Sequence, residues 1–117
     1  MLNITRAEHA KVIVLRLVGV VNDADSYEMV RAAIHACLQQ GHYHLVLNFK
    51  SVAFIDNVGF GVLLEDLGRF RSLHGDIKLA EVSVQGERLL RMMGLLRVFD
   101  LYKVESAAIR GYQREAA

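Results

Sequence analysis

The most informative segment of the sequence is Phe54-Ile55-Asp56-Asn57-Val58-Gly59-Phe60-Gly61-Val62-Leu63-Leu64. Its polar Asp56-Asn57 pair separates a short apolar segment, residues 52–55, from an apolar run with helical spacing that continues to Leu73. We therefore expect a helix that opens at this pair. In this interpretation Asn57 caps the helix and Asp56 complements its positive end, which together stabilise it by about 1–2 kcal/mol.

Two glycines, Gly59 and Gly61, lie in the first turns of this expected helix. A glycine costs roughly 1 kcal/mol relative to alanine in a helix interior. Their presence in an otherwise good helix indicates that close packing, or access to the backbone, matters at the helix start.

Strands and helices alternate on both sides of this turn. The apolar, β-branched run over residues 12–18 is typical of a strand covered on both faces, and residues 2–9 predict a more polar strand at an edge. Further strands are expected over residues 45–49, 77–82 and 98–101, and further helices over residues 23–40, 85–93 and 105–114. Either Asn22 or Asp23 caps the first of these helices. Because such alternation needs crossover connections, we predict one α/β domain over residues 1–117, with a mostly parallel four- to five-stranded sheet packed with about four helices.

The overall composition excludes several classes of function. Fourteen basic and thirteen acidic residues leave a net charge of +1, and the arginines are spread among acids, so nucleic-acid binding is not expected. No apolar run approaches the roughly 20 residues that cross a bilayer, and the first residues lack the apolar core of a signal peptide. The single Cys37 indicates a small buried side chain in a reducing compartment. We expect a cytoplasmic protein that does not insert into a membrane.

The sequence also lacks the motifs that carry catalysis. The serines are not set in a G-x-S-x-G turn, no GxxxxGK[ST] phosphate loop occurs, and Gly59-Phe60-Gly61 lacks the third glycine of a dinucleotide-binding motif. His42 and His44 have no Cys, Asp or Glu beside them at a metal-ligand spacing, so the histidines are interpreted as exposed loop residues. We expect a protein that is not an enzyme and that uses no metal or cofactor.

The stretch from Phe54 to Leu64 resembles the signature of STAS domains, in which a strand leads through a hydrophobic-hydrophobic-Asp-Ser-Ser-Gly-Leu-Gly turn into a helix. Three other segments resemble the family's Gly-Glu-Leu-Asp turn, its Leu-Asp-Leu strand and its late Leu-x-x-x-Gly-Leu helix end. These segments are, in that order, Leu17-Val18-Gly19 with Asn22-Asp23, Leu45-Val46-Leu47-Asn48-Phe49, and Leu89-Leu90-Arg91-Met92-Met93-Gly94-Leu95. The resemblance runs from about Val12 to Ile109 and implies a STAS-type fold for nearly the whole chain.

Within this family the chain resembles the anti-sigma factor antagonists. Such a protein binds an anti-sigma factor that is also a serine kinase and thereby frees the sigma factor. The kinase then phosphorylates the second serine of the motif and the complex separates, because a phosphate adds nearly two negative charges to the docking surface. The resemblance implies a protein-binding module of transcription regulation and signalling, with an anti-sigma factor/serine kinase as its partner in a partner-switching system.

This sequence departs from the family at the switch itself. The two serine positions hold Asn57 and Val58, so the position that is usually phosphorylated has no hydroxyl. Asn48 replaces the acid of the family's strand, while Asp56 is retained. We hypothesise that the chain keeps the docking surface and has lost the phosphoryl switch, with Ser51 as the nearest alternative hydroxyl.

The expected partner-binding surface joins the start of the second helix to the turn before the first one. Its residues are Asn22, Asp23, Asp56, Asn57, Val58, Gly59 and Phe60. An exposed Phe60 would anchor the partner, since aromatic side chains are enriched in binding hot spots, whereas the alternative places Phe60 in the core. Other readings stay open: a scaffold or accessory STAS subunit of a signalling, lipid-transport or transporter complex that is not phosphorylated, or a small-ligand sensor. A homodimer is compatible with each reading.

Overall fold

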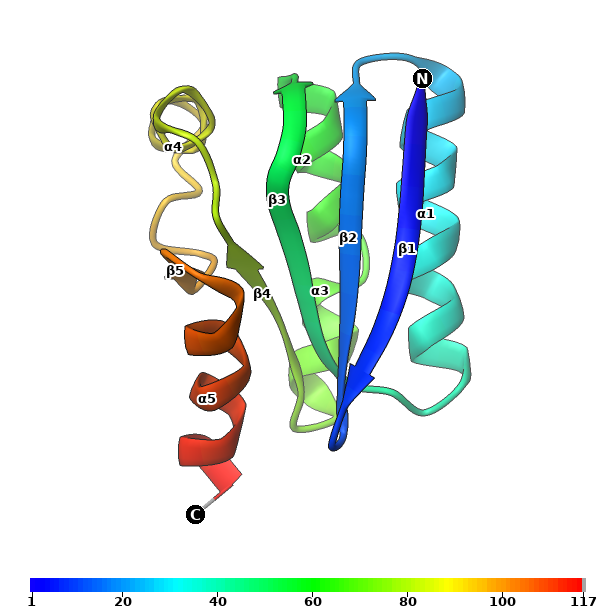
Figure 1. Ribbon diagram of the computed structural model, residues 1–117, viewed down its shortest axis with the longest axis vertical. Coiled ribbons are helices and arrows are strands. Elements are labelled where there is room, and N and C mark those ends of the chain that lie inside the picture. Colours follow the sequence, from blue (N-terminus) through cyan, green and yellow to red (C-terminus); the bar gives the residue numbers. More distant parts are fainter. Residues whose placement is uncertain (117) are drawn as a thin grey trace.

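The computed structural model describes residues 1–116, and the side chains of residues 1–114. Strands and helices alternate along this part of the chain (Figure 1): β1 (Leu2–His9), β2 (Val12–Val21), α1 (Ala24–Gln39), β3 (His44–Ile55), α2 (Asn57–Leu64), α3 (Leu67–Ser72), β4 (Asp76–Ala80), α4 (Val84–Met92), β5 (Leu101–Tyr102) and α5 (Glu105–Ala116). The strands form one sheet in the order β1-β2-β3-β4-β5, with β1 antiparallel to β2 and the other neighbours parallel. The α/β class, the mostly parallel sheet and the edge position of β1 are confirmed.

Three elements differ from the expected ones. The last strand, β5, covers only Leu101–Tyr102, so the expectation of a strand over residues 98–101 is wrong for residues 98–100. Strand β3 joins the two apolar segments that the sequence suggested into one strand, and its register with β2 shifts between Arg16 and Val18, which leaves room for extra residues in β3. The expected second helix is divided into α2 and α3, since the chain tightens at Glu65, whose amide donates to the Val62 carbonyl. None of the helices in residues 1–116 is long and apolar enough to cross a membrane.

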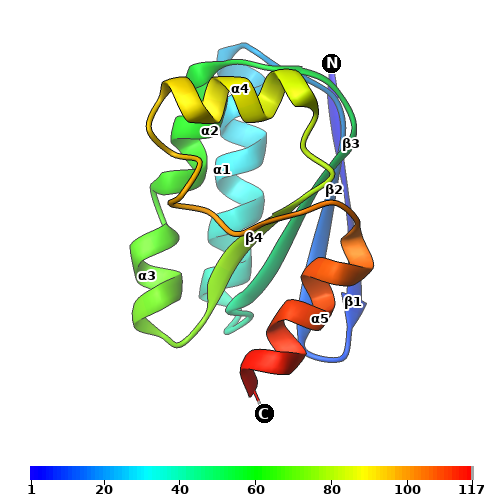
Figure 2. The same ribbon diagram turned by 90° about the vertical axis from the view of Figure 1, so that its left-hand side faces the viewer.

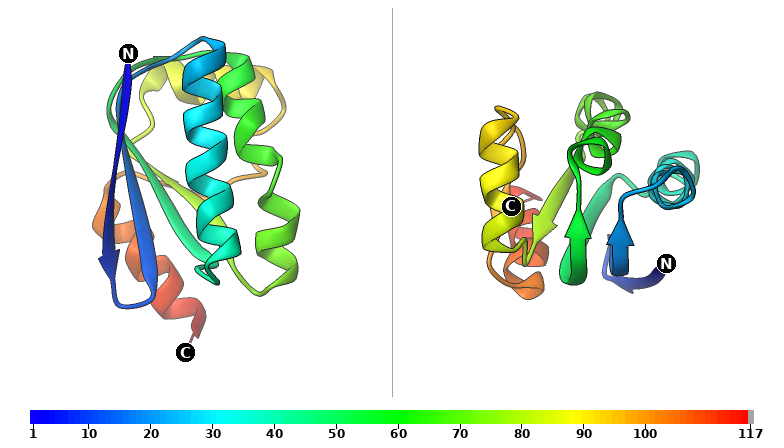
Figure 3. Two further views of the ribbon diagram at one scale, coloured as in Figure 1. Left: turned by 90° about the vertical axis from the view of Figure 1, so that its right-hand side faces the viewer. Right: turned by 90° about the horizontal axis from the view of Figure 1, so that it is seen from above.

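The helices cover the two faces of the sheet unequally (Figures 2 and 3). The larger core lies on the face covered by α1, α2, α3 and α4, and it includes Ile13, Leu47, Phe60, Phe70 and Leu90. On the opposite face, α5 packs Ala108 and Tyr112 against Val14, Val46 and Ala80 toward the other end of the strands. The central strands are therefore buried on both sides, as their continuous apolar sequence predicts.

Helix α1 begins at a reciprocal cap. The Asp23 carboxylate accepts from the Ser26 amide at 2.8 Å, and the Ser26 hydroxyl oxygen accepts from the amides of Asn22 and Asp23 at 3.0 Å. Of the two capping residues that the sequence allowed, the structure selects Asp23. Such a cap is worth about 1 kcal/mol, and it fixes the turn that carries Asn22 at one end of the molecule.

A polar network connects α5 to the sheet. Arg16 donates two hydrogen bonds to Glu105, at 2.9 and 2.8 Å, and this contact lowers the pKa of the Glu105 carboxyl to about 2. The Asn48 amide group donates to Glu105 at 2.9 Å and to Glu81 at 3.2 Å, while its carbonyl oxygen accepts from the Lys50 amide. An aspartate at position 48 could not donate to either glutamate, which gives a physical reason for asparagine at this strand position.

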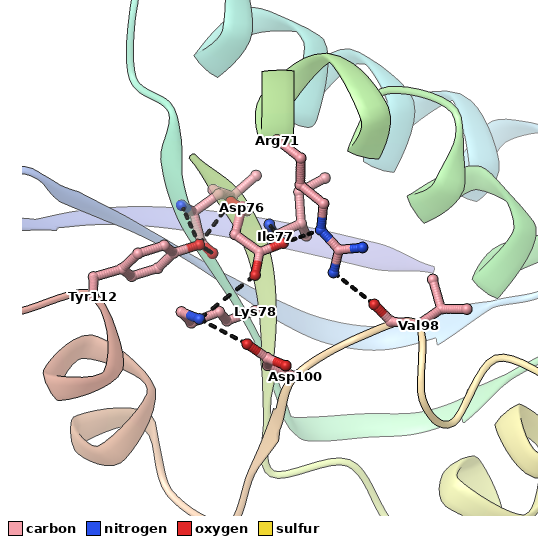
Figure 4. Close-up of polar contacts among 8 residues, drawn as sticks. Arg71, Asp76, Ile77, Lys78, Val98, Asp100 and Tyr112 are labelled. Carbon is pink, nitrogen blue, oxygen red and sulfur yellow. Dashed lines mark hydrogen bonds and ion pairs between the residues drawn. The ribbon is translucent and has the colours of Figure 1, made fainter. Parts of the chain in front are cut away.

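A lysine is completely buried between β4 and α5 (Figure 4). The Lys78 ammonium lies 3.0 Å from Asp100 and 3.5 Å from Asp76, and 4.8 Å from the centre of the Tyr112 ring. Asp76 also pairs with Arg71 at 2.9 Å. The Tyr112 hydroxyl accepts from the Leu45 amide, and its single hydrogen faces the carbonyls of Leu45 in β3 and Asp76 in β4, at 2.7 and 2.6 Å. Charge pairing and hydrogen bonding thus compensate the cost of burying this amine.

Candidate functional site

The start of α2 is fixed by Asp56, the residue before the helix. One oxygen of its carboxylate accepts from the Gly59 amide at 2.9 Å, and the Asp56 amide donates to the Val21 carbonyl at the end of β2. The expectation that Asn57 caps the helix is wrong, because Asn57 is already the first helical residue and its side chain is exposed. Asp56 both caps α2 and places its charge at the positive end of the helix.

Tyr27 links the start of α1 to the start of α2 by a hydrogen bond. Its hydroxyl donates to the second oxygen of the Asp56 carboxylate, and this hydrogen bond, with burial and the nearby charges, raises the pKa of Tyr27 to about 12. Both helices begin at the same end of the molecule and run side by side (Figure 3, left). The turn with Asn22 and Asp23 and the first turn of α2 therefore form one surface.

The two glycines of α2 have different roles. A Cβ atom at Gly59 would lie 2.7 Å from the Ile55 side chain and 2.9 Å from the Val21 side chain, so this position needs glycine for packing. A Cβ atom at Gly61 would meet nothing within 4 Å. The close packing that we expected for both glycines is present at Gly59 alone.

This difference predicts opposite effects of the same substitution. Gly59→Ala should lower the free energy of unfolding by about 1–3 kcal/mol, since the added methyl group overpacks a filled site. Gly61→Ala should raise it by about 0.5–1 kcal/mol, since alanine gains helix propensity without a clash. Urea denaturation of the two variants checks this, and a loss of equal size at both positions would contradict the assigned packing.

Of the two alternatives for Phe60, the structure selects the core. Phe60 is fully buried, with its ring centre 6.0 Å from that of Phe49, so its side chain cannot anchor a partner. The exposed apolar side chains at this end include Phe54, with 52% of its surface accessible, and Val58, with 49%. Strand alternation could have indicated Phe54, because an inward Ile55 places its neighbour outward.

Beside Phe54 lies an apolar hollow of about 270 Å³ between the end of β3 and the start of α4. Its lining includes Val52, Phe54, Val82 and Leu89, and no charged side chain is part of it. With Phe54 and Val58 it forms an apolar surface next to the capped start of α2, and exposed apolar patches of this kind mark interaction sites.

The two segments that carry the starts of α1 and α2 hold charges of one sign. The segments from Leu17 to Val30 and from Ser51 to Leu64 contain no lysine, arginine or histidine. Their acids are Asp23, Asp25, Glu28 and Asp56. Hydrogen bonds from the backbone and side chain of Ser26 lower the pKa of Asp23, so it is ionised at neutral pH. The site therefore combines exposed apolar groups with negative charge and suits a ligand that is apolar and basic.

The hydroxyl of Ser51 does not belong to this site. Ser51 lies inside β3, where it pairs with Val18 of β2. It borders a separate polar hollow that Arg16 and Glu105 also line. Among the described residues, no group of three or more His, Cys, Asp and Glu side chains is arranged to hold a metal ion.

The chain is similar to known proteins in both sequence and structure. The family model described as STAS domain matches residues 3–108. The anti-sigma F factor antagonist of Paenibacillus polymyxa is 31% identical over 112 residues, which cover 92% of each chain. The unphosphorylated anti-sigma factor antagonist SpoIIAA superposes with a TM-score of 0.81 at 23% identity, covering 95% of this chain and 96% of its own. An anti-sigma factor antagonist from Mycobacterium paratuberculosis gives 0.84 at 21% identity, covering 95% and 93%. SpoIIAA has also been solved in its phosphorylated form, with a TM-score of 0.73, 23% identity, and coverage of 94% and 99%.

Proposed function

The chain belongs to the STAS domain family, and we propose that it docks on an anti-sigma factor/serine kinase as a regulatory module that is not switched by phosphorylation at position 58. The Paenibacillus polymyxa relative, which matches nearly the whole chain, is an anti-sigma F factor antagonist. The same class of function is supported by the surface at the start of α2.

The observation that carries this proposal is the exposed Val58 in the first turn of α2. In the resembled family this position is a serine that accepts phosphate, and SpoIIAA exists in a phosphorylated form. Valine has no hydroxyl and cannot accept a phosphoryl group. Its accessible methyl groups instead extend the apolar surface that Phe54 begins. Docking would therefore persist in the presence of the kinase and ATP.

The surface also indicates the chemistry of the partner. Phe54, Val58 and the hollow between β3 and α4 offer apolar contacts, and the acids Asp23 and Asp56 lie at the starts of α1 and α2. A partner with a protruding apolar side chain beside arginine or lysine residues fits both features. The apolar contacts would supply most of the affinity, while the charges would raise the association rate and its dependence on salt.

Phe54→Ser tests this surface directly. We expect affinity for the serine-kinase anti-sigma factor encoded nearest to the gene of this chain to fall by at least about tenfold, because an exposed aromatic anchor is lost. Leu73→Ser is the matched control, since Leu73 is 40% exposed and lies at the opposite end of the molecule, after α3. Isothermal titration calorimetry measures both.

Equal affinities for the wild type, Phe54→Ser and Leu73→Ser would place the docking surface elsewhere. If the wild-type protein does not bind the kinase at all, the result would favour the alternative function, that of a scaffold or accessory STAS subunit.

A further inference from the structure

We infer that Tyr27 is a positioning residue for partner binding: through Asp56 it fixes the first turn of α2 against the first turn of α1. This inference rests on the proposed function, because it concerns the same surface. It adds a residue that the motif does not contain and that lies 29 positions before Asp56 in the sequence.

Asp56 forms hydrogen bonds to three segments, namely β2, α2 and α1. Its amide donates to the Val21 carbonyl at the end of β2, and one carboxylate oxygen caps α2 through the Gly59 amide. The other carboxylate oxygen accepts from the Tyr27 hydroxyl, and the Tyr27 amide itself donates to the Asp23 carbonyl in the first turn of α1. The carboxylate is thereby held from two sides, and its position depends on Tyr27.

The hydrogen bond between Tyr27 and Asp56 is not what holds the two helices together. Helices α1 and α2 pack against each other, and both bury apolar side chains in the same core, Ile34 and Leu63 among them. The Tyr27 hydroxyl sets a finer relation, that between the turn with Asp23 and the turn with Val58. These two turns carry the charged and the apolar parts of the docking surface.

Fixing this relation before binding favours the complex. When the two turns already have their bound arrangement, they lose less conformational freedom as a partner contacts them. The gain should appear mainly in the dissociation rate, which changes most among variants of one interface. Tyr27→Phe keeps the ring and removes the hydroxyl, so it measures the effect of the hydrogen bond to Asp56 alone.

Tyr27→Phe should lower the affinity for the serine kinase of the neighbouring gene by about tenfold. This fold-change corresponds to the lower end of the free energies that hydrogen bonds to charged groups contribute. Tyr112→Phe is the control. It removes a hydroxyl that bonds to the Leu45 and Asp76 backbone under α5, so it should lower the melting temperature and leave the affinity unchanged. A merely structural role for Tyr27 would make the two variants behave alike, with the affinity measured at a temperature where both are folded.

Hydrogen exchange gives a second measurement that needs no partner. Tyr27→Phe should speed exchange of the Gly59 amide, whose acceptor is Asp56, by about tenfold. Tyr112→Phe should leave the ratio of Gly59 exchange to that of the α4 amides unchanged. Wild-type affinity in Tyr27→Phe, or wild-type exchange at Gly59, would overturn the inference. A wild-type protein that fails to bind would refute the proposed function, and exchange would then still decide whether Tyr27 fixes the turn.

Discussion

Val58→Ser should turn this chain into a substrate of the kinase that it binds and should make the complex sensitive to ATP. Val58 lies in the first turn of α2 with half of its surface accessible, so a serine there presents its hydroxyl to solvent. Phosphorylation would add nearly two negative charges beside Asp23, Asp25 and Asp56. We expect the phosphorylated variant to bind about 100-fold more weakly than the unmodified one, which corresponds to about 2.7 kcal/mol.

Val58→Ala is the matched control for this prediction. It also removes the valine methyl groups but adds no hydroxyl, so its affinity should be the same with and without ATP. Intact mass reports the phosphate, and calorimetry before and after incubation with ATP reports the affinity. A Val58→Ser protein that binds the kinase but gains no phosphate would show that more than a hydroxyl separates this chain from a switched antagonist.

Lys78→Ala should lower the free energy of unfolding by about 3–5 kcal/mol. The lysine is fully buried, and its removal would leave a cavity and deprive Asp76 of one of its two cations. The Asp76 side chain is only 12% exposed, so water cannot replace the lost partner effectively. A domain of this size is stable by about 5–15 kcal/mol, so this single change removes a large part of its stability.

Lys78→Met separates the two causes. Methionine fills much of the cavity but carries no charge. The difference in unfolding free energy between Lys78→Ala and Lys78→Met therefore measures packing, and the difference between Lys78→Met and the wild type measures the charge. Lys50→Ala, at an exposed lysine of β3, should change stability by less than about 0.5 kcal/mol. Urea denaturation compares the variants, and a cost below about 1 kcal/mol for Lys78→Ala would contradict the assigned network.

Much of the fold follows from the order of apolar patterns along the chain. The continuous run in β2 and the turn at Asp56 predict a buried strand and a helix start, and both are present. The division between α2 and α3 is hidden because apolar residues keep helical spacing through it, at Leu63, Leu64 and Leu67. Lys78 looks like a solvent-facing residue in an alternating strand, but α5 covers that face of β4, and α5 is placed by tertiary packing.

The location of the site is predictable from the same turn, whereas its details are not. Residue type alone cannot decide between neighbouring caps, so Asp56 was indistinguishable from Asn57 in capping α2. The inward Phe60 depends on helix rotation, which the sequence leaves free over a short apolar run, and alternation places Phe54 outward only once Ile55 is known to point inward. The contact between Tyr27 and Asp56 joins residues far apart in the chain and follows from the packing of α1 beside α2.

Docking on the kinase should be independent of phosphorylation of this chain. The most direct measurement incubates the wild-type chain with the serine-kinase anti-sigma factor of the neighbouring gene and ATP, and then records both intact mass and complex formation. We expect a stable complex and a chain without added phosphate. A chain that gains one phosphate per molecule and releases the kinase would contradict this expectation.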